Sequence, residues 1–433
     1  RPGDAVAVLA GNSLELAALL FACARARLVL VGLSTRLAPP QWELMCDHMD
    51  VRLRLADPGV PLPGALDLAA VVAEGGPEVA WSAPAEDETF AVVFTSGTTG
   101  RPKASQVVHR ASVHSGMSYQ RVLQLGPSDV TAVLFPLTYI SALHAHLLPA
   151  MLGGASCVLT AASSATEYVA LLHRHDVTWA YAVPSWWRLC LRVPGFRDLP
   201  ALARLAAGGA PFPVDLQDAL RERLPGVRLH DVYGLSETHS PACIADDAAL
   251  RARPASVGRP LPCMEAQVRS LDDGGVLPAG QPGELWLRGS LVTTGYARDP
   301  AATAAAVVDG WFDTGDVARL EDDGSVVVLD RTKDMVNRGG AKVFSAEVEE
   351  VLRQHPAVED AAVIGVPDPL AGEAVAAFVV ASSDVSAAEV RAWVRDHLAE
   401  HAAPRKVVFL DALPRNALGK TDKQELRRRA TGP

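Results

Sequence analysis

The stretch FAVVFTSGTTGRPK, residues 90–103, joins an apolar run of strand length to a loop of hydroxyl side chains and glycines that ends in one lysine. Such a loop offers backbone N–H groups, hydroxyl donors and a compact positive charge to the phosphates of a nucleotide. A polar surface loop has a similar composition, so the stretch by itself leaves both interpretations open. It is not a P-loop, and the one Gly-Lys-Thr sequence of the chain, residues 419–421, has Pro414 where that motif needs its first glycine.

The apolar run belongs to a repeating pattern of strand-like and helix-like segments. Apolar segments of strand length are AVAVLA (5–10), FAVVF (90–94), TAVLFPL (131–137), ASCVLT (155–160), VTWAYAV (177–183) and LARLAAGGA (202–210). Between them lie segments with apolar residues at helical spacing, such as TEYVALLHRH (166–175). This alternation predicts an α/β fold whose parallel sheets are covered by helices.

The pattern changes towards the C-terminus. From about residue 256, strand-like segments such as GELWLRG (283–289) are separated by Gly and Pro turns, which predicts a β-rich subdomain. The remainder is mixed and includes a helix that begins at Ser345. We therefore expect a large N-terminal domain over residues 1–332, with the β-rich subdomain at its end, and a small α+β domain over residues 333–433.

Composition argues against several classes of protein. A chain of 433 residues with 49% hydrophobic residues can form large cores, and its net charge of −10 argues against a nucleic-acid partner. The six cysteines show no Cys-x-x-Cys spacing, which favours reduced thiols in the cytoplasm over disulfides or a zinc site. The most apolar window, residues 14–33, has Arg25 and Arg27 at its centre, so we expect a buried helix and a strand, not a membrane span. Without an initiating methionine or a signal-peptide pattern, the sequence is expected to begin inside a domain.

One hairpin can be worked out from its spacing. The segment DVARLEDDGSVVVLDR, residues 316–331, has Asp323-Gly324 at its middle, a pair typical of a two-residue turn. Counting outward from that turn places Asp316 opposite Arg331 at the open end. An exposed ion pair of this kind contributes under ~1 kcal/mol to stability. A carboxylate beside a hydrogen-bond donor is also what a ribose diol requires.

Six stretches, in order, resemble the AMP-forming adenylating enzymes, which include acyl-CoA synthetases, adenylation domains and beetle luciferases. They are TSGTTGRPK (95–103), AGGAPFP (207–213), YGLSET (233–238), GWFDTGDVARLEDDGSVVVLDRTKD (310–334), NRGGAKVFSAEVEEVL (337–352) and LPRNALGKTDKQEL (413–426). Each alone would be weak, but together they extend over nearly the whole chain. The resemblance is closest to acyl- or aryl-CoA synthetases, and it implies that the small C-terminal domain is mobile and that the start of the large domain is truncated.

The resemblance implies nucleotide-binding roles for residues of these stretches. The loop at 95–103 looks like the family's loop that closes over the β- and γ-phosphates of ATP, and Glu237 looks like the Mg²⁺ ligand. Gly209, Ala210 and Pro211 look like the adenine-side wall. The residues that resemble phosphate, adenine and ribose contacts are Thr95, Ser96, Gly97, Thr98, Thr99, Lys103, Gly209, Ala210, Pro211, Tyr233, Ser236, Asp316 and Arg331.

The same resemblance implies a two-step reaction. A carboxylic acid and ATP–Mg²⁺ give an acyl-adenylate and pyrophosphate, and a thiol then takes the acyl group after the small domain rotates. Lys420 matches the lysine that reaches into the site for the first step, and Lys333 falls on the hinge. Gly339 and Gly340 would line the thiol's entry. The acceptor is expected to be coenzyme A, the alternatives being a carrier protein's phosphopantetheine and a relative that binds nucleotide without activity.

The acyl pocket in similar enzymes is walled by segments that here read PLTYISA (136–142), VPSWWRL (183–189) and AGGAP (207–211). Tyr139 stands where many acyl-CoA synthetases have a gating histidine, which leaves the pocket gate open to question. Trp186 and Trp187 follow Pro184 on an expected helix and would point about 100° apart, so at most one faces the pocket while the other packs in the core. Two large rings, Tyr139 and one tryptophan, would shorten the cavity and predict a short, branched or aromatic acid over a long-chain fatty acid. Gly208 and Gly234 are further candidates for the substrate site.

Overall fold

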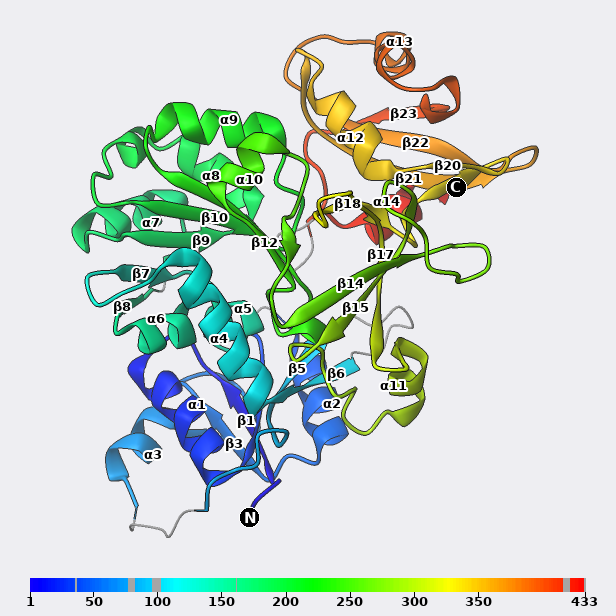
Figure 1. The fold of residues 1–433 in the computed structure, drawn as a ribbon. Coiled ribbons are helices and arrows are strands. Elements are labelled where there is room, and N and C mark those ends of the chain that lie inside the picture. Colours follow the sequence, from blue (N-terminus) through cyan, green and yellow to red (C-terminus); the bar gives the residue numbers. More distant parts are fainter. Residues whose placement is uncertain (36, 77–81, 96–102, 161, 416–420, 432–433) are drawn as a thin grey trace. The chain divides into compact units, whose positions relative to one another are not determined.

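The computed structural model describes residues 1–35, 37–76, 82–95, 103–160, 162–415 and 421–431 (Figure 1). The chain forms two compact units, Arg1–Ala266 with Trp286–Thr314, and Gln267–Leu285 with Gly315–Pro433. Residues 267–285 and 315–332 thus belong to the smaller unit, whereas the sequence divides the domains at residues 332/333. The expected boundary at residues 332/333 is a hinge between moving domains, and the division into compact units describes a single conformation. The expected boundary therefore stays a prediction. Within the described ranges, no helix is both long enough and apolar enough to cross a membrane.

The first unit begins with a six-stranded sheet of order β4-β3-β1-β2-β5-β6. Its strands are β1 Ala5–Leu9, β2 Val29–Gly32, β3 Leu53–Ala56, β4 Leu66–Asp67, β5 Thr89–Thr95 and β6 Lys103–Val108. Neighbouring strands are parallel except β5 and β6, which are antiparallel and pair Thr95 with Lys103. Helices α1 (Leu14–Ala26), α2 (Pro39–Met49) and α3 (Leu68–Glu74) connect the parallel strands. The window at residues 14–33 therefore forms a helix and a strand, as expected, but the helix is not buried: it packs Leu16, Leu20 and Cys23 inward while Leu14 is 77% exposed.

A second sheet of the first unit has seven strands in the order β13-β12-β11-β10-β9-β7-β8. They are β7 Val130–Val133, β8 Ser156–Leu159, β9 Trp179–Ala182, β10 Arg204–Gly208, β11 Arg228–Tyr233, β12 Cys243–Ala245 and β13 Arg259–Pro260. The strands from β7 to β11 are parallel, and β12 and β13 are antiparallel additions at one edge. The α/β class expected from the alternating pattern is confirmed.

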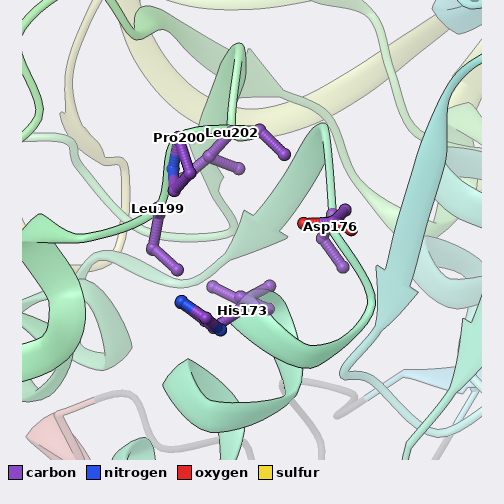
Figure 2. A pocket seen from close by; sticks show the side chains of 8 residues that line it. His173, Asp176, Leu199, Pro200 and Leu202 are labelled. Carbon is purple, nitrogen blue, oxygen red and sulfur yellow. The ribbon is translucent and has the colours of Figure 1, made fainter.

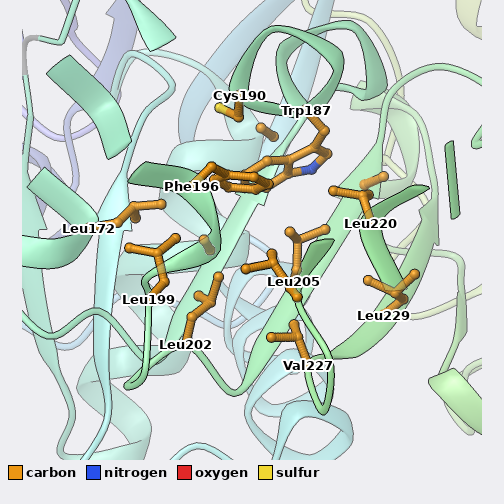
Figure 3. Packing of buried hydrophobic residues seen from close by; sticks show 14 of the residues in the cluster. Leu172, Trp187, Cys190, Phe196, Leu199, Leu202, Leu205, Leu220, Val227 and Leu229 are labelled. Carbon is orange, nitrogen blue, oxygen red and sulfur yellow. The ribbon is translucent and has the colours of Figure 1, made fainter. Parts of the chain in front are cut away.

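Helices cover both faces of the second sheet. One face carries α7 (Ala165–Arg174), α8 (Pro184–Leu191), α9 (Val214–Arg223) and α10 (Asp247–Ala252), whose apolar residues pack with Leu205 and Leu229 of the sheet (Figure 3). Alternate residues of the same strands, such as Trp179 and Tyr181, point to the opposite face. There lie α4 (His109–Leu123), α5 (Ile140–Ala142), the π-helix η1 (Leu143–Leu147) and α6 (Leu148–Gly153). The Trp179 indole donates to the carbonyl of Ala145 on η1.

The chain passes between the two units inside three strands, β14 (Met264–Arg269), β15 (Pro282–Gly289) and β17 (Trp311–Leu320). The first unit also holds α11 (Pro300–Ala306) and β16 (Val307–Val308), and the second holds β18 (Val326–Arg331). The second unit has its own sheet, made of β19 Val336–Arg338, β20 Ala341–Val343, β21 Val358–Asp368, β22 Gly372–Ala381 and β23 Lys406–Phe409. Its helices are α12 (Ser345–Arg353), α13 (Ala387–His397) and α14 (Lys423–Thr431). The helix expected at Ser345 is therefore confirmed.

The β17–β18 hairpin pairs Asp316 with Arg331, as its spacing predicts, but the turn differs from the expected one. Leu320 pairs with Val326 and Glu321 bonds back to Ser325, so the loop has three residues, and Gly324 has a φ of 79°. A loop of this kind ends in a left-handed residue, which favours glycine. The register shifts by one residue between Val317 and Ala318. This bulge compensates for the longer loop and restores the Asp316–Arg331 pair.

Candidate active site

Glu237 and Thr95 meet where two parts of the first unit come together. Glu237 lies in a short 3₁₀ turn, η3 (Ser236–Thr238), just beyond the end of β11. Its Oε1 atom accepts hydrogen bonds from the Thr95 hydroxyl at 3.2 Å and from the Tyr296 hydroxyl at 3.0 Å. The carboxylate is buried, with 8% of the residue exposed. The first residue of the predicted phosphate loop and the predicted Mg²⁺ ligand are therefore neighbours.

Tyr296 is the residue of this junction that the sequence did not indicate. Burial and the Glu237 carboxylate raise the pKa of Tyr296 above its usual value, so its hydroxyl stays protonated and donates. The Lys103 ammonium lies over the Tyr296 ring, 4.9 Å from its centroid. Tyr296 thus contacts both Glu237 and Lys103. An isolated tyrosine in a loop has no periodicity or spacing that links it to either residue, so no sequence signal could have identified it.

The donor set fits a hard divalent cation. In the described part of the chain, the second carboxylate oxygen of Glu237 accepts no hydrogen bond, and Glu237 has no ion pair. No group of three His, Cys, Asp or Glu side chains gathers within those same ranges. Mg²⁺ is commonly held by one or two carboxylates together with substrate phosphates and water, so a single buried carboxylate is compatible with it.

The ends of β10 and β11 bring the predicted adenine-side residues together. These parallel strands are neighbours and pair Gly208 with Val232, so the segment after Gly208 lies beside Tyr233. Ligands bind at the carboxyl ends of parallel strands in sheets of this type. A Cβ atom on Gly208 would lie 2.5 Å from the Tyr181 hydroxyl, and Gly209 has a φ of 75°, so both positions require glycine.

In the second unit, the Asp316–Arg331 pair expected from the hairpin is present. Arg331 Nε lies 2.7 Å from Asp316 Oδ1, and the Asp316 side chain is 4% exposed while that of Arg331 is 45% exposed. A buried carboxylate held by a half-exposed guanidinium is more than a surface ion pair, because its desolvation must be compensated. The ribose contact assigned to the pair stays a prediction.

Two further predicted sites lie in turns of the second unit. Gly339 and Gly340 connect β19 to β20 with φ values of 62° and 91°, and the Gly339 N–H donates to the carbonyl of Ala371 at 2.8 Å. Lys333 lies between β18 and β19, and its carbonyl accepts a hydrogen bond from Arg427 of α14 at 3.1 Å. These backbone contacts fix both turns in the present conformation. The thiol-entry and hinge roles stay predictions.

Two family models match the chain. The model of the AMP-binding enzyme matches residues 1–297, and that of the AMP-binding enzyme C-terminal domain matches residues 347–420. The chain belongs to the AMP-binding enzyme family. The resemblance drawn from the six sequence stretches is confirmed, and so is the α/β architecture of a large and a small part.

Similar proteins include CoA synthases and an amide bond synthetase. A feruloyl-CoA synthase of Amycolatopsis sp. is 34% identical, over 99% of this chain and 89% of that protein. The o-succinylbenzoate coenzyme A synthetase of Bacillus subtilis, solved with its acyl-adenylate intermediate, is 29% identical with a TM-score of 0.88, over 100% and 89% of the two chains. An amide bond synthetase of Marinactinospora thermotolerans is 30% identical with a TM-score of 0.90, over 99% and 90%. The expected enzyme class, an AMP-forming ligase, is confirmed.

Several family residues predicted from the sequence lie outside the described ranges. They are Ser96, Gly97, Thr98 and Thr99 of the phosphate loop and the adenylation lysine, Lys420. The two strands that flank the phosphate loop in the sequence are described, and they pair Thr95 with Lys103.

The two predicted pocket tryptophans have different environments. Trp187 is fully buried, and its indole N–H donates to the carbonyl of Ala206 at 2.8 Å (Figure 3). It packs with Phe196 in the core under α8, so it does not wall a pocket. Trp186 is only partly buried and stands edge-on to Tyr168, with ring centroids 6.1 Å apart. Trp186 therefore remains the candidate for the pocket wall.

Tyr139, the candidate gate of the acyl pocket, is held by a hydrogen bond. Its hydroxyl lies 2.8 Å from the Ser34 hydroxyl, and the Ser34 carbonyl accepts from the Trp42 indole. A separate shallow hollow, lined in part by His173, Asp176 and Leu199, contains none of the predicted site residues (Figure 2).

Proposed function

We propose that the chain activates an aryl acid, or another short carboxylic acid, with ATP and Mg²⁺ and transfers the acyl group to the thiol of coenzyme A. Membership of the AMP-binding enzyme family supports the adenylation step. The names of the similar CoA ligases, feruloyl-CoA synthase and o-succinylbenzoate coenzyme A synthetase, support an aromatic acid and coenzyme A.

The observation that carries this proposal is the buried Glu237 carboxylate, which Thr95 and Tyr296 orient. A buried carboxylate without a cation is costly, and its presence beside the predicted phosphate loop is explained by a metal-bound nucleotide. Glu237 would hold Mg²⁺, which would neutralise charge on the phosphates. Lys103 would approach the outer phosphates as a flexible point charge.

Residues of the other predicted sites supply the remaining functions. Asp316 and Arg331 would bind the ribose hydroxyls, and Lys420 would stabilise the negative charge that accumulates as the carboxylate attacks the α-phosphate. Rotation at Lys333 would then bring Gly339 and Gly340 to the thiol's path. Six free cysteines are compatible with the reducing cytoplasm.

The acceptor is tested separately from the acid. We expect pyrophosphate release from ATP with ferulate, 4-coumarate or benzoate, faster than with palmitate, and an acyl-CoA product only when coenzyme A is added. A carrier protein bearing phosphopantetheine and a simple amine serve as competing acceptors, the amine because one similar structure is an amide bond synthetase. Pyrophosphate release without transfer to coenzyme A would contradict the acceptor. No release with any acid would indicate a nucleotide-binding relative without activity.

Glu237→Gln tests the carboxylate itself. The variant keeps an oxygen that can accept from Thr95 and Tyr296 but loses the charge, so we expect a higher Mg²⁺ requirement for pyrophosphate release and unchanged or improved thermal stability. An unchanged Mg²⁺ dependence would contradict the proposed role of Glu237.

A further inference from the structure

The turn that follows Glu237 adopts an unusual backbone conformation. His239 and Ser240 have φ values of 52° and 28°, in the left-handed region that non-glycine residues rarely occupy. Such residues are energetically unfavourable and persist only where the surroundings hold them. The surroundings of this turn therefore determine where the Glu237 carboxylate lies.

The His239 side chain ties the turn to two other segments of the first unit. Its Nδ1 lies 2.6 Å from the carbonyl oxygen of Leu291, and its Nε2 lies 3.0 Å from that of Gln106 on β6. The residue is fully buried, so both contacts lie inside the first unit.

A second buried histidine holds the backbone of the same turn. His144 Nδ1 lies 2.7 Å from the His239 carbonyl oxygen and donates to it. Its Nε2 lies 2.9 Å from the Ser112 hydroxyl of α4 and accepts from it. The Ser115 hydroxyl, one turn further along α4, lies 3.0 Å from the His239 carbonyl oxygen and closer still to that of Ser240, so it donates to the backbone of the turn. The Tyr119 hydroxyl reaches the Ser240 side chain at 3.0 Å.

The other side of the turn is fixed by Thr293. Its N–H donates to the Glu237 carbonyl at 2.7 Å, and its hydroxyl donates to the Gln106 carbonyl at 2.9 Å. The Glu237 backbone is thus held between the loop after β15 and the histidine contacts. Neither His144 nor His239 reaches the carboxylate in any hydrogen bond of the described residues.

We propose that His144 is a positioning residue of the adenylation step, acting through the His239 carbonyl to hold the turn that orients the Glu237 carboxylate. This inference rests on the proposed function of Glu237. The π-helix η1 places His144 beside the turn. Together with Ser115 and Tyr119, it bonds to buried polar groups of the turn, and each of these contacts would be lost if the turn moved away.

Two substitutions of His144 test the contact because they keep different halves of the imidazole. An asparagine amide nitrogen can occupy the place of Nδ1, so His144→Asn retains the bond to the His239 carbonyl. A glutamine amide oxygen can occupy the place of Nε2 and accept from Ser112, so His144→Gln retains that contact and loses the bond to the turn. Both variants carry the same amide group at position 144, and the contacts of His144 described above are to the protein itself.

The assay is ATP–pyrophosphate exchange with the acid that gives the fastest pyrophosphate release in wild type, together with thermal unfolding with and without ATP–Mg²⁺. We expect His144→Gln to lose about tenfold in kcat with the KM for ATP nearly unchanged, and His144→Asn to stay within about threefold of wild type. Ser115→Ala, a smaller change, should lower kcat in the same direction. The stabilisation by ATP–Mg²⁺ should be nearly the same in wild type and both variants, because ATP binding is unchanged and only the reaction step is slowed.

Equal exchange rates for the asparagine and glutamine variants would overturn the inference, as would losses that follow thermal stability alone. If neither His144 variant folds, an unchanged kcat in Ser115→Ala would overturn it. Wild-type protein without exchange for any acid would overturn the proposed function, and this inference with it. Exchange in wild type with no difference between the variants would overturn this inference alone.

Discussion

Replacing His146 by glutamine should make the protein less sensitive to acid. His146 lies in η1, fully buried, with Nδ1 2.8 Å from the Thr131 hydroxyl and Nε2 without a partner among the described residues. Burial lowers the pKa of His146 from its usual 6.5 to about 3. The folded protein therefore keeps the ring neutral, while the unfolded chain binds a proton below pH 6.5. Stability from this residue is complete above pH 6.5 and is lost as the pH falls towards 3.

The size of the effect follows from that shift. Below pH 6.5 a histidine that is neutral in the fold lowers the free energy of unfolding by ~1.4 kcal/mol per pH unit, or ~2 kcal/mol between pH 7 and pH 5. Glutamine does not titrate, so the loss of the Nδ1 bond to Thr131 costs the variant the same stability at both pH values. On going from pH 7 to pH 5, the difference in stability between variant and wild type should thus shift by ~2 kcal/mol in the variant's favour.

Urea unfolding at the two pH values, followed by tryptophan fluorescence, measures this shift, because the Trp179 ring lies 6.4 Å from that of His146. Where unfolding is irreversible, unfolding rates replace free energies. The exposed His175→Gln is the matched control and should show no shift of this kind. If wild type and His146→Gln lose the same stability between pH 7 and pH 5, the assignment of a neutral buried ring is wrong.

Four further predictions concern the reaction. Lys420→Ala should slow acyl-adenylate formation by orders of magnitude, because ~3 kcal/mol or more of charge stabilisation is lost. Transfer from a supplied acyl-adenylate should survive, and equal loss of both half-reactions in folded protein would contradict this. Lys333→Pro should spare acyl-adenylate formation and slow thioester formation, because the fixed φ blocks rotation while the bonded N–H groups of this turn belong to Thr332, Asp334 and Met335. Normal thioester formation in this variant would contradict the hinge role. Asp316→Ala should raise the KM for ATP and reduce discrimination against 2′- and 3′-deoxy-ATP, whereas equal losses with all three would indicate a structural ion pair. Trp187→Ala should destabilise the first unit by ~3–5 kcal/mol, as measured by unfolding. Trp186→Ala should extend the length of acid accepted in an acid panel, at nearly unchanged stability. The opposite pattern in the two variants would reverse the assignment of the two rings.

Much of the fold and of the site could be predicted from the sequence because its signals are local. Alternating apolar runs and helical spacings gave the α/β class, and Arg25 and Arg27 argued correctly for a helix and a strand at 14–33, although the helix is half exposed and not buried. Six short stretches were enough to recognise the family. The Asp316–Arg331 pair was found by counting from a turn, although the loop is one residue longer and a bulge restores the register.

The tertiary structure decided which distant residues meet. Tyr296 contacts Glu237 across 59 positions of sequence, and His239 reaches Gln106 across 133. The sequence spacing around Tyr296 and His239 predicts neither contact, because each contact depends on how loops from different strands pack. The same holds for Trp186 and Trp187, which adjoin in sequence and differ in burial because a helix turns by about 100° per residue. The sequence by itself determined the chemical groups and the local geometry, whereas long-range packing decided which groups are buried, which are paired and which remain available to a substrate.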